Sequence, residues 1–294
     1  MTSMDSPGFG RPRPGRKLGP IADSVGSAHR AWLEPVRETY LRSGLTLNDL
    51  SGRARVAKSK ISELLRGTGL YPRWEIVLSL GTELKLPDWP LHSLWRQAAL
   101  EAHKSREWVE GCSEKTLTTS AAPPLEHCAF SELVEDRYRR YAQCFLEDIP
   151  RDIAVSNSFD ILWLRWNDAL ASPDHRRFAW EVLRATVMSR TPHLDGRPEL
   201  GSAAFDTVAL SSMTTQIDRM NQFTESLELF KAISRLPDHQ LDVTVLRSLC
   251  GFTQRGASAL LGVSMASVRS DERHARRFLE SLIYPPPKTE GNTA

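Results

Sequence analysis

Apolar residues in this chain recur mostly at spacings of three and four, the repeat of a helix with one buried face. No segment shows the convincing alternation of apolar and polar residues that marks a half-buried strand. The pattern therefore predicts an all-α fold. Loose stretches rich in Gly, Pro and polar residues divide the chain into a disordered basic tail, a first helical domain, a linker, a second helical domain, a second linker, a third helical domain and a short tail: 1–27, 28–105, 106–126, 127–195, 196–230, 231–284 and 285–294.

The first helical domain contains two short helices joined by a tight turn. Thr46 is a capping residue, and Asp49 three positions later completes a capping-box pair. The second helix is the stretch AKSKISELLRG, which ends at Gly67. In the helix before this pair, Pro35 predicts a start only shortly upstream, because proline is tolerated in the first turn alone.

The second of these helices is basic. Five basic residues and one acid lie between residues 53 and 66, which suits the neutralisation of phosphates. A turn followed by a small basic helix is a shape that enters the major groove of DNA; the alternative is a plain helical bundle with a solvated basic face. The residues expected to contact bases are Lys58, Ser59 and Ser62, and those expected to contact phosphates are Lys60 and Arg66.

A comparable pair of helices lies near the other end of the chain. Thr253 caps the first helix, Gly262 makes the turn, and the last helix buries its apolar positions while turning arginines outward. Helical spacing predicts that Glu272 faces away from Arg269, so that Asp271 opposes DNA more strongly. A bundle that docks on protein remains the alternative. The candidate DNA contacts are Ser264, which also caps this helix, and Ser267, Arg269, Arg273 and Arg276.

The stretch TLNDLSGRARVAKSKISELLRG resembles the phage-repressor-like (Xre-type) helix-turn-helix family. Two positions depart from that family. Arg55 stands where the turn usually has glycine, and Ala57 replaces the usual capping serine. Neither change removes the motif, so the resemblance implies a DNA-binding domain.

The run LPDHQLDVTVLRSLCGFTQRGASALLGVSMASVRSDERHARRFLESL is similar to promoter-binding region 4 of sigma-70-type factors. The middle segments FSELVEDRYRRYAQCFL, SFDILWLRW and FAWEVLRATVMSR resemble region 2 of extracytoplasmic-function sigma factors, which docks on core RNA polymerase and melts the promoter. The acidic patch of that family is reduced to Asp152 in the sequence PRDIAVSNS. The resemblance implies an Xre-type domain fused to a degenerate sigma-like factor.

The overall composition and the motifs that are missing argue against several classes of protein. With 38 basic and 36 acidic residues the net charge is only +2, so the case for DNA rests on where the charges lie. We find no phosphate-cradling glycine loop, no metal-ligand cluster and no nucleophile elbow, which predicts neither an enzyme nor a cofactor. No apolar run is long enough to span a membrane, and the N-terminus lacks a secretory signal. The four cysteines form no CxxC pair and are expected to be reduced thiols of a cytoplasmic protein: Cys112, Cys128, Cys144 and Cys250.

Together these features predict a sequence-specific transcription regulator of sigma-like architecture that acts at promoters, with double-stranded DNA as its partner. Two alternatives stay open. One is a working alternative sigma factor that recruits core RNA polymerase, and the other is a protein-interaction module of a signalling system. The oligomeric state is left open, since two DNA-binding modules in one chain can substitute for a dimer.

Overall fold

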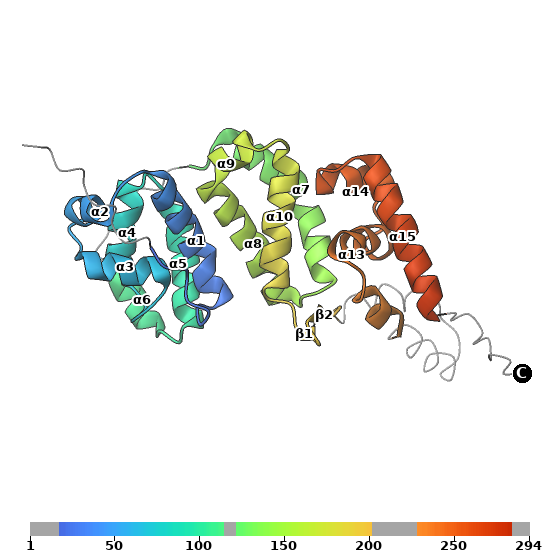
Figure 1. The fold of residues 1–294 in the computed structure, drawn as a ribbon, viewed down its shortest axis with the longest axis horizontal. Helices are drawn as coiled ribbons and strands as arrows, with labels where there is room; N and C mark the ends of the chain where they lie inside the picture. Colours follow the sequence, from blue (N-terminus) through green and yellow to red (C-terminus); the bar gives the residue numbers. More distant parts are fainter. Residues whose placement is uncertain (1–17, 115–121, 202–227, 284–294) are drawn as a thin grey trace, which may run out of the picture.

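The computed structural model describes residues 18–114, 122–201 and 228–283, and Figure 1 shows its fold. Within these residues nearly all of the regular secondary structure is helical. The one sheet found there is a two-stranded antiparallel hairpin that pairs His193 with Pro198. The prediction of an all-α fold is therefore confirmed.

The described elements follow one another as a row of helices. In chain order they are α1 (Ser27–Arg42), α2 (Leu47–Ala54), α3 (Lys58–Arg66), α4 (Trp74–Glu83), α5 (Asp88–Glu101), α6 (Arg106–Ser113), α7 (Leu125–Gln143), α8 (Asp148–Leu164), α9 (Trp166–Ala171), α10 (His175–Met188), β1 (His193–Leu194), β2 (Arg197–Pro198), α13 (Asp238–Thr244), the π-helical turn η1 (Val245–Leu249), α14 (Gln254–Leu261) and α15 (Met265–Ile283). Figure 1 shows α1–α6 at one end of an elongated molecule, α7–α10 in the middle and α13–α15 at the other end.

The start of the first helix differs from the prediction. Helix α1 begins at Ser27 and carries Pro35 in its interior, although proline removes one helical hydrogen bond there. The reason is burial: Trp32, Leu33 and Val36 are completely buried on both sides of the proline. Burying one such side chain contributes about 1.5–3 kcal/mol, which together outweighs a cost of about 3 kcal/mol for the proline.

The predicted N-terminal tail also differs at its C-terminal end, since residues 18–26 pack against the first domain. Val25 is buried, and the Ala22 amide donates to the Arg66 carbonyl at 2.9 Å. Arg37 joins this segment to α3 by donating to the carbonyls of Gly19 and Leu65, at 2.6 and 2.7 Å. Residues 1–17 of the predicted tail, and the predicted tail 285–294, lie outside the described residues.

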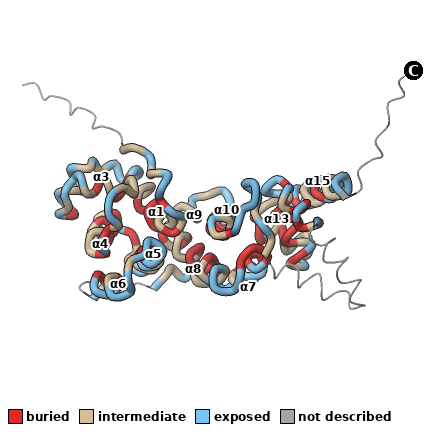
Figure 2. Tube along the Cα trace, turned by 90° about the horizontal axis from the view of Figure 1, so that it is seen from below, coloured by how far each residue is buried: buried red, intermediate tan, exposed pale blue. Residues whose placement is uncertain are grey.

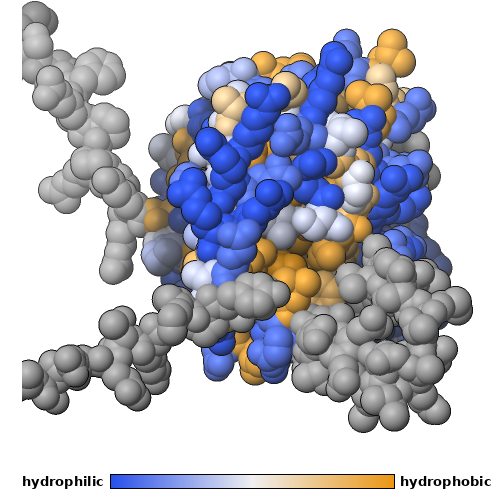
Figure 3. Space-filling model, turned by 90° about the vertical axis from the view of Figure 1, so that its right-hand side faces the viewer, coloured by the Kyte–Doolittle hydropathy of each residue, from blue (hydrophilic) through white to orange (hydrophobic). Residues whose placement is uncertain are grey.

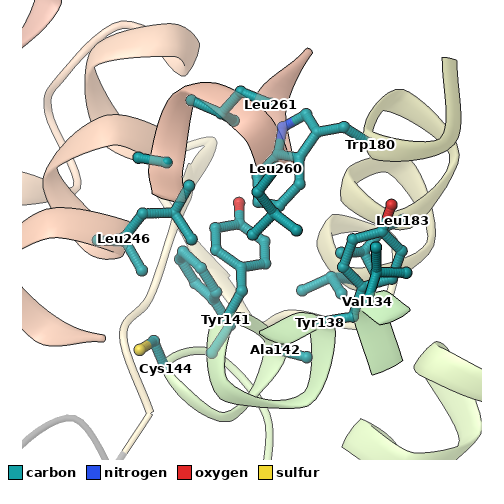
Figure 4. Packing of buried hydrophobic residues seen from close by; sticks show 14 of the residues in the cluster. Val134, Tyr138, Tyr141, Ala142, Cys144, Trp180, Leu183, Leu246, Leu260 and Leu261 are labelled. Carbon is teal, nitrogen blue, oxygen red and sulfur yellow. The ribbon is translucent and has the colours of Figure 1, made fainter. Parts of the chain in front are cut away.

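Buried apolar side chains form two cores. The first joins α1–α6 and includes Leu164 from α8. The second runs from Phe130 in α7 to Ala275 in α15, so the middle and the C-terminal part of the chain share one continuous core. Figure 2 shows the buried positions on the inner sides of these helices, and Figure 4 shows Trp180 of α10 beside Leu260 and Leu261 of α14.

A buried polar group fixes the C-terminal part on the middle. The Asp242 carboxylate, in α13, is 1% exposed. It accepts hydrogen bonds from the Tyr141 hydroxyl at 2.7 Å, the Trp180 indole at 3.2 Å and the Arg184 guanidinium at 2.9 Å. Burial raises the pKa of Asp242, and these three donors act in the opposite direction. A buried carboxylate with this many partners is satisfied, and removing one of them leaves an unpaired polar group.

Ion pairs join the first domain to the middle. Arg165 lies 3.1 Å from Glu38 of α1, and Arg190 lies 3.0 Å from Glu101 of α5. Arg42 of α1 also pairs with Asp168 of α9. Helix α8 packs directly on α1 and α5, so these charges border a packed contact between helices.

Candidate nucleic-acid interface

Helices α2 and α3, which we call the first helix pair, have the predicted caps and turn. The Thr46 hydroxyl accepts from the Asp49 amide at 3.2 Å, and the Asp49 carboxylate accepts from the Thr46 amide at 2.9 Å. This is the predicted capping box. Helix α3 starts after Ala57, which supplies no side-chain cap, and ends at Gly67 in the left-handed conformation. Arg55, between the helices, also has a left-handed backbone, with φ of 53°.

The predicted contact residues of the first helix pair divide into exposed and covered ones. Lys58 and Ser59 are exposed at the start of α3, while Ser62 is half-buried. Lys60 is half-buried and lies 3.6 Å from Glu63. Arg66 is half-buried too, and its guanidinium donates to the Ser62 carbonyl at 3.1 Å. The side chains most open to a partner are therefore those at the N-terminal end of α3.

Helices α14 and α15, which we call the second helix pair, have the same type of cap and turn as the first helix pair. Thr253 caps α14 by accepting from the Gly256 amide at 3.0 Å, and Gly262 makes the turn with φ of 64°. In both pairs a serine hydroxyl donates to the carbonyl of the valine in the turn: Ser51 to Val56 at 2.7 Å, and Ser258 to Val263 at 2.6 Å. The two helix pairs therefore share the same type of cap and turn.

The last helix begins as predicted. The Ser264 hydroxyl accepts from the Ser267 amide at 3.0 Å, and the two hydroxyls lie 2.9 Å apart on the exposed surface. Val268 and Ala275 are buried in the second core. The arginines of α15 are exposed on the other side: Arg269, Arg273, Arg276 and Arg277.

Three of these arginines line one open cleft of about 620 Å³. Helix α15 contributes these three arginines, which are Arg269, Arg273 and Arg276, together with Ala266 and Glu272 to its lining, and Arg247 of η1 and Gln254 of α14 contribute the rest. Figure 3 looks onto this end of the molecule and shows hydrophilic side chains over most of its described surface. The arrangement presents several guanidinium groups, which suit phosphate oxygens and the edges of guanine bases.

The acids of α15 lie differently from the prediction. Glu272 lines the arginine cleft and shares a partner with Arg269, since the side chain of Gln254 hydrogen-bonds both, at 2.9 and 3.2 Å. It is neutralised there by Arg247 at 3.3 Å. Asp271 lies instead in a second cleft that contains Arg177 and Arg184 of α10. The predicted orientation of Glu272 away from Arg269 is therefore wrong, because both side chains line the arginine cleft, whereas Asp271 lies outside it.

Sequence reasoning missed Arg247 and Gln254. Both lie on helices before the turn. The packing of α14 on α15 brings Gln254 to the cleft, and Arg247 reaches it through its ion pair with Glu272. A pattern read along one helix gives no signal for such residues. Gln254 donates a hydrogen bond to Glu272 and Arg247 forms an ion pair with it, so both residues hold this acid in place within the cleft.

The stretch PRDIAVSNS, where sigma factors have an acidic patch, contains one acid, and this acid is paired with arginines. Asp152 is exposed but pairs with Arg151 at 2.9 Å and Arg139 at 3.7 Å. Asn157, in the same stretch, is only 4% exposed. An acid introduced at that position would therefore be buried, whereas Ser156 is exposed.

Comparison with protein-family models, with curated proteins and with solved structures finds no match. The similarities to Xre-type domains and to sigma factors therefore stay predictions. Among the described residues no helix is long and apolar enough to cross a membrane, and no group of His, Cys, Asp and Glu is arranged to hold a metal ion.

Proposed function

We propose that this protein is a sequence-specific DNA-binding transcription regulator that acts at promoters. The observation that carries the proposal is the arginine cleft on the second helix pair. Four arginines and one glutamate give its lining a net charge of +3, and Arg247 already neutralises the glutamate. The cleft borders a helix whose N-terminal end is exposed, which is how helix–turn–helix proteins present a recognition helix to the major groove.

The first helix pair supports the same proposal. It repeats the cap, the left-handed turn residue and the serine-to-carbonyl bond of the second pair. Its α3 exposes Lys58 and Ser59 at the end that reads bases in such motifs. Two such pairs at opposite ends of one molecule (Figure 1) would let a single chain contact two DNA segments, in the bacterial cytoplasm.

The alternative of a working sigma factor is less well supported. Docking on core RNA polymerase by charge requires free acids, and Asp152 is held by two arginines. We therefore favour a sigma-derived regulator over a factor that recruits polymerase. A pull-down with core RNA polymerase, followed by promoter-dependent transcription, distinguishes the two: strong binding and promoter opening by the wild-type chain would favour the sigma factor.

The test of DNA binding uses the full chain and fluorescence anisotropy of labelled duplexes across a salt series. Arg269→Ala and Arg273→Ala should each weaken binding and reduce the salt slope by about one unit, because each removes a phosphate or base contact. Arg277→Ala is the matched control, since Arg277 is exposed on the same helix but outside the cleft. It should leave the slope nearly unchanged.

A second arm addresses the first helix pair on a duplex selected by the wild-type protein. Lys58→Ala should cost about 1–3 kcal/mol in binding and relax the preference at one base position. Arg106→Ala, which removes an exposed charge at the start of α6, serves as its control. If the full chain shows no salt-dependent binding to any duplex at low ionic strength, the proposed function is wrong.

A further inference from the structure

Two of the four cysteines face each other across the junction between the middle and the C-terminal part. Cys144 follows the last residue of α7, and Cys250 follows η1. Their sulfur atoms are 3.7 Å apart although the residues are 106 positions apart in the chain. Both thiols also lie 3.5 Å from the Arg140 carbonyl oxygen, so one backbone group orients the pair.

The other two cysteines have a different setting. Cys112 is buried in the first core, and the Cys128 thiol lies 3.8 Å from the Pro123 carbonyl. Neither has a second thiol beside it in the described part of the chain. The pairing at Cys144 and Cys250 is therefore a specific feature of the junction.

We propose that Cys144 and Cys250 are a modification site at which a reversible disulfide forms when the protein meets an oxidising small disulfide such as glutathione disulfide. A disulfide bond measures about 2.05 Å, so the two sulfur atoms need to approach by less than 2 Å. Each cysteine stands at the end of a helix rather than inside one, and Cys250 precedes Gly251 in a left-handed turn. Side-chain rotation and a small shift at these ends can supply the movement.

The reaction proceeds by thiol–disulfide exchange. Cys250 is the half-buried partner and the accessible one, whereas Cys144 is 7% exposed. The Cys250 thiolate attacks one sulfur of the small disulfide, forms a mixed disulfide and releases one small thiol. Cys144 then attacks the Cys250 sulfur and releases the second small thiol. Two protein thiols are oxidised, one small disulfide is reduced to two thiols, and the two protons leave with those thiols.

The order of attack follows from the surroundings. The neighbouring Cys250 thiol and burial both raise the pKa of Cys144 above its ordinary value, so Cys144 stays protonated at rest. It becomes reactive toward Cys250 only once a mixed disulfide brings an electrophilic sulfur within reach. The mixed disulfide on Cys250 is therefore the expected intermediate.

The bridge would tie α7 covalently to the segment that carries the second helix pair. It would act beside the noncovalent attachment at Asp242 and restrain the unfolded chain through a long loop. The oxidised protein should therefore resist separation of the second helix pair from the middle of the molecule. This inference does not depend on DNA binding.

The test treats the folded full chain with glutathione disulfide, blocks free thiols with N-ethylmaleimide and maps the peptides by mass spectrometry. We expect a linked Cys144–Cys250 peptide pair, with Cys112 and Cys128 blocked as free thiols. Cys144→Ala should instead accumulate a glutathione adduct on Cys250. Cys128→Ala is the matched control and should leave the bridge intact.

Thermal unfolding supplies a second readout, which distinguishes a disulfide that fits the native fold from one that strains it. The oxidised wild type should melt roughly 5–15 °C above the reduced protein, and Cys144→Ala should show no such difference. A bridge that forms only in denaturant, a bridge that lowers the Tm, or a Cys250 adduct that never passes to Cys144 in the wild type would each overturn the proposal.

Discussion

The substitution Gly262→Ala tests how the second helix pair is attached to the rest of the molecule. Gly262 makes the turn between α14 and α15 and packs against the first turn of α10. A Cβ added there would lie 2.3 Å from the Arg177 backbone nitrogen and 2.8 Å from its Cα. Because the obstacle is mainly backbone, no side-chain rotation can relieve it, and either the turn or α10 has to move.

The expected loss in the free energy of unfolding has two parts, one from the backbone and one from packing. Gly262 has φ of 64°, where an L-residue costs about 1–2 kcal/mol, partly offset by about 0.4–1 kcal/mol because alanine restricts the unfolded chain. Overpacking against α10 adds about 1–3 kcal/mol. The free energy of unfolding should therefore fall by roughly 1–4.5 kcal/mol, which is a substantial part of the about 5–15 kcal/mol typical of a domain.

Gly251→Ala separates these parts. Gly251 has φ of 70°, but a Cβ there meets nothing within 4 Å, so this variant carries the backbone cost alone. Urea unfolding followed by tryptophan fluorescence suits both variants, since Trp180 lies in the shared core. The excess cost of Gly262→Ala measures the contact with α10. Equal costs for the two variants would show that the turn does not rest on α10 in solution.

Two further changes test smaller features. Arg55→Gly should raise the free energy of unfolding by about 0.5–1 kcal/mol in the same assay, because glycine relieves the left-handed strain at φ of 53° but loses more backbone entropy on folding. Burial raises the pKa of Asp160 from 3.8 to about 6, so the folded protein holds a proton that the unfolded chain releases, and stability falls as the pH rises from about 4 to 6. Asp160→Asn should remove this fall and stabilise the protein by about 1–3 kcal/mol at pH 7, with little effect at pH 3. If the free energy of unfolding of the variant changes with pH between about 3 and 7 in the same way as that of the wild type does, the assignment is wrong.

Features that depend on a few neighbouring residues could be predicted from the sequence. The Thr46 and Asp49 capping box, the Gly67 stop and the Ser264 cap are each fixed by side chains within one turn, and the structure contains all three. The uninterrupted α1 could not be predicted in this way. Its continuation through Pro35 depends on how much apolar surface the whole domain buries, which a local rule for proline does not include.

The shared core shows the same limit at a larger scale. Apolar spacing predicts that the helices each have one buried face, but not that the faces of the middle and C-terminal helices are buried against each other. Asp242 follows Leu241 in a short helix and gives no sign in the sequence of its contacts with Tyr141, Trp180 and Arg184. Long-range partners of this kind follow from the tertiary fold alone.

The two helix pairs share their caps and turns but use the inner face of the second helix differently. Aligning Thr46 with Thr253 places the buried Leu64 and Leu65 of α3 at the positions of Asp271 and Glu272 in α15. The first pair therefore completes its own apolar core, whereas the second turns charges toward Arg247 and toward the cleft that holds Arg177 and Arg184. Glu272 lies among the outward arginines but is paired with Arg247 of η1, and Asp271 lies outside the arginine cleft. The outward arginines therefore stay largely unneutralised. For this reason α15 can present a basic cleft although its numbers of basic and acidic residues are nearly equal.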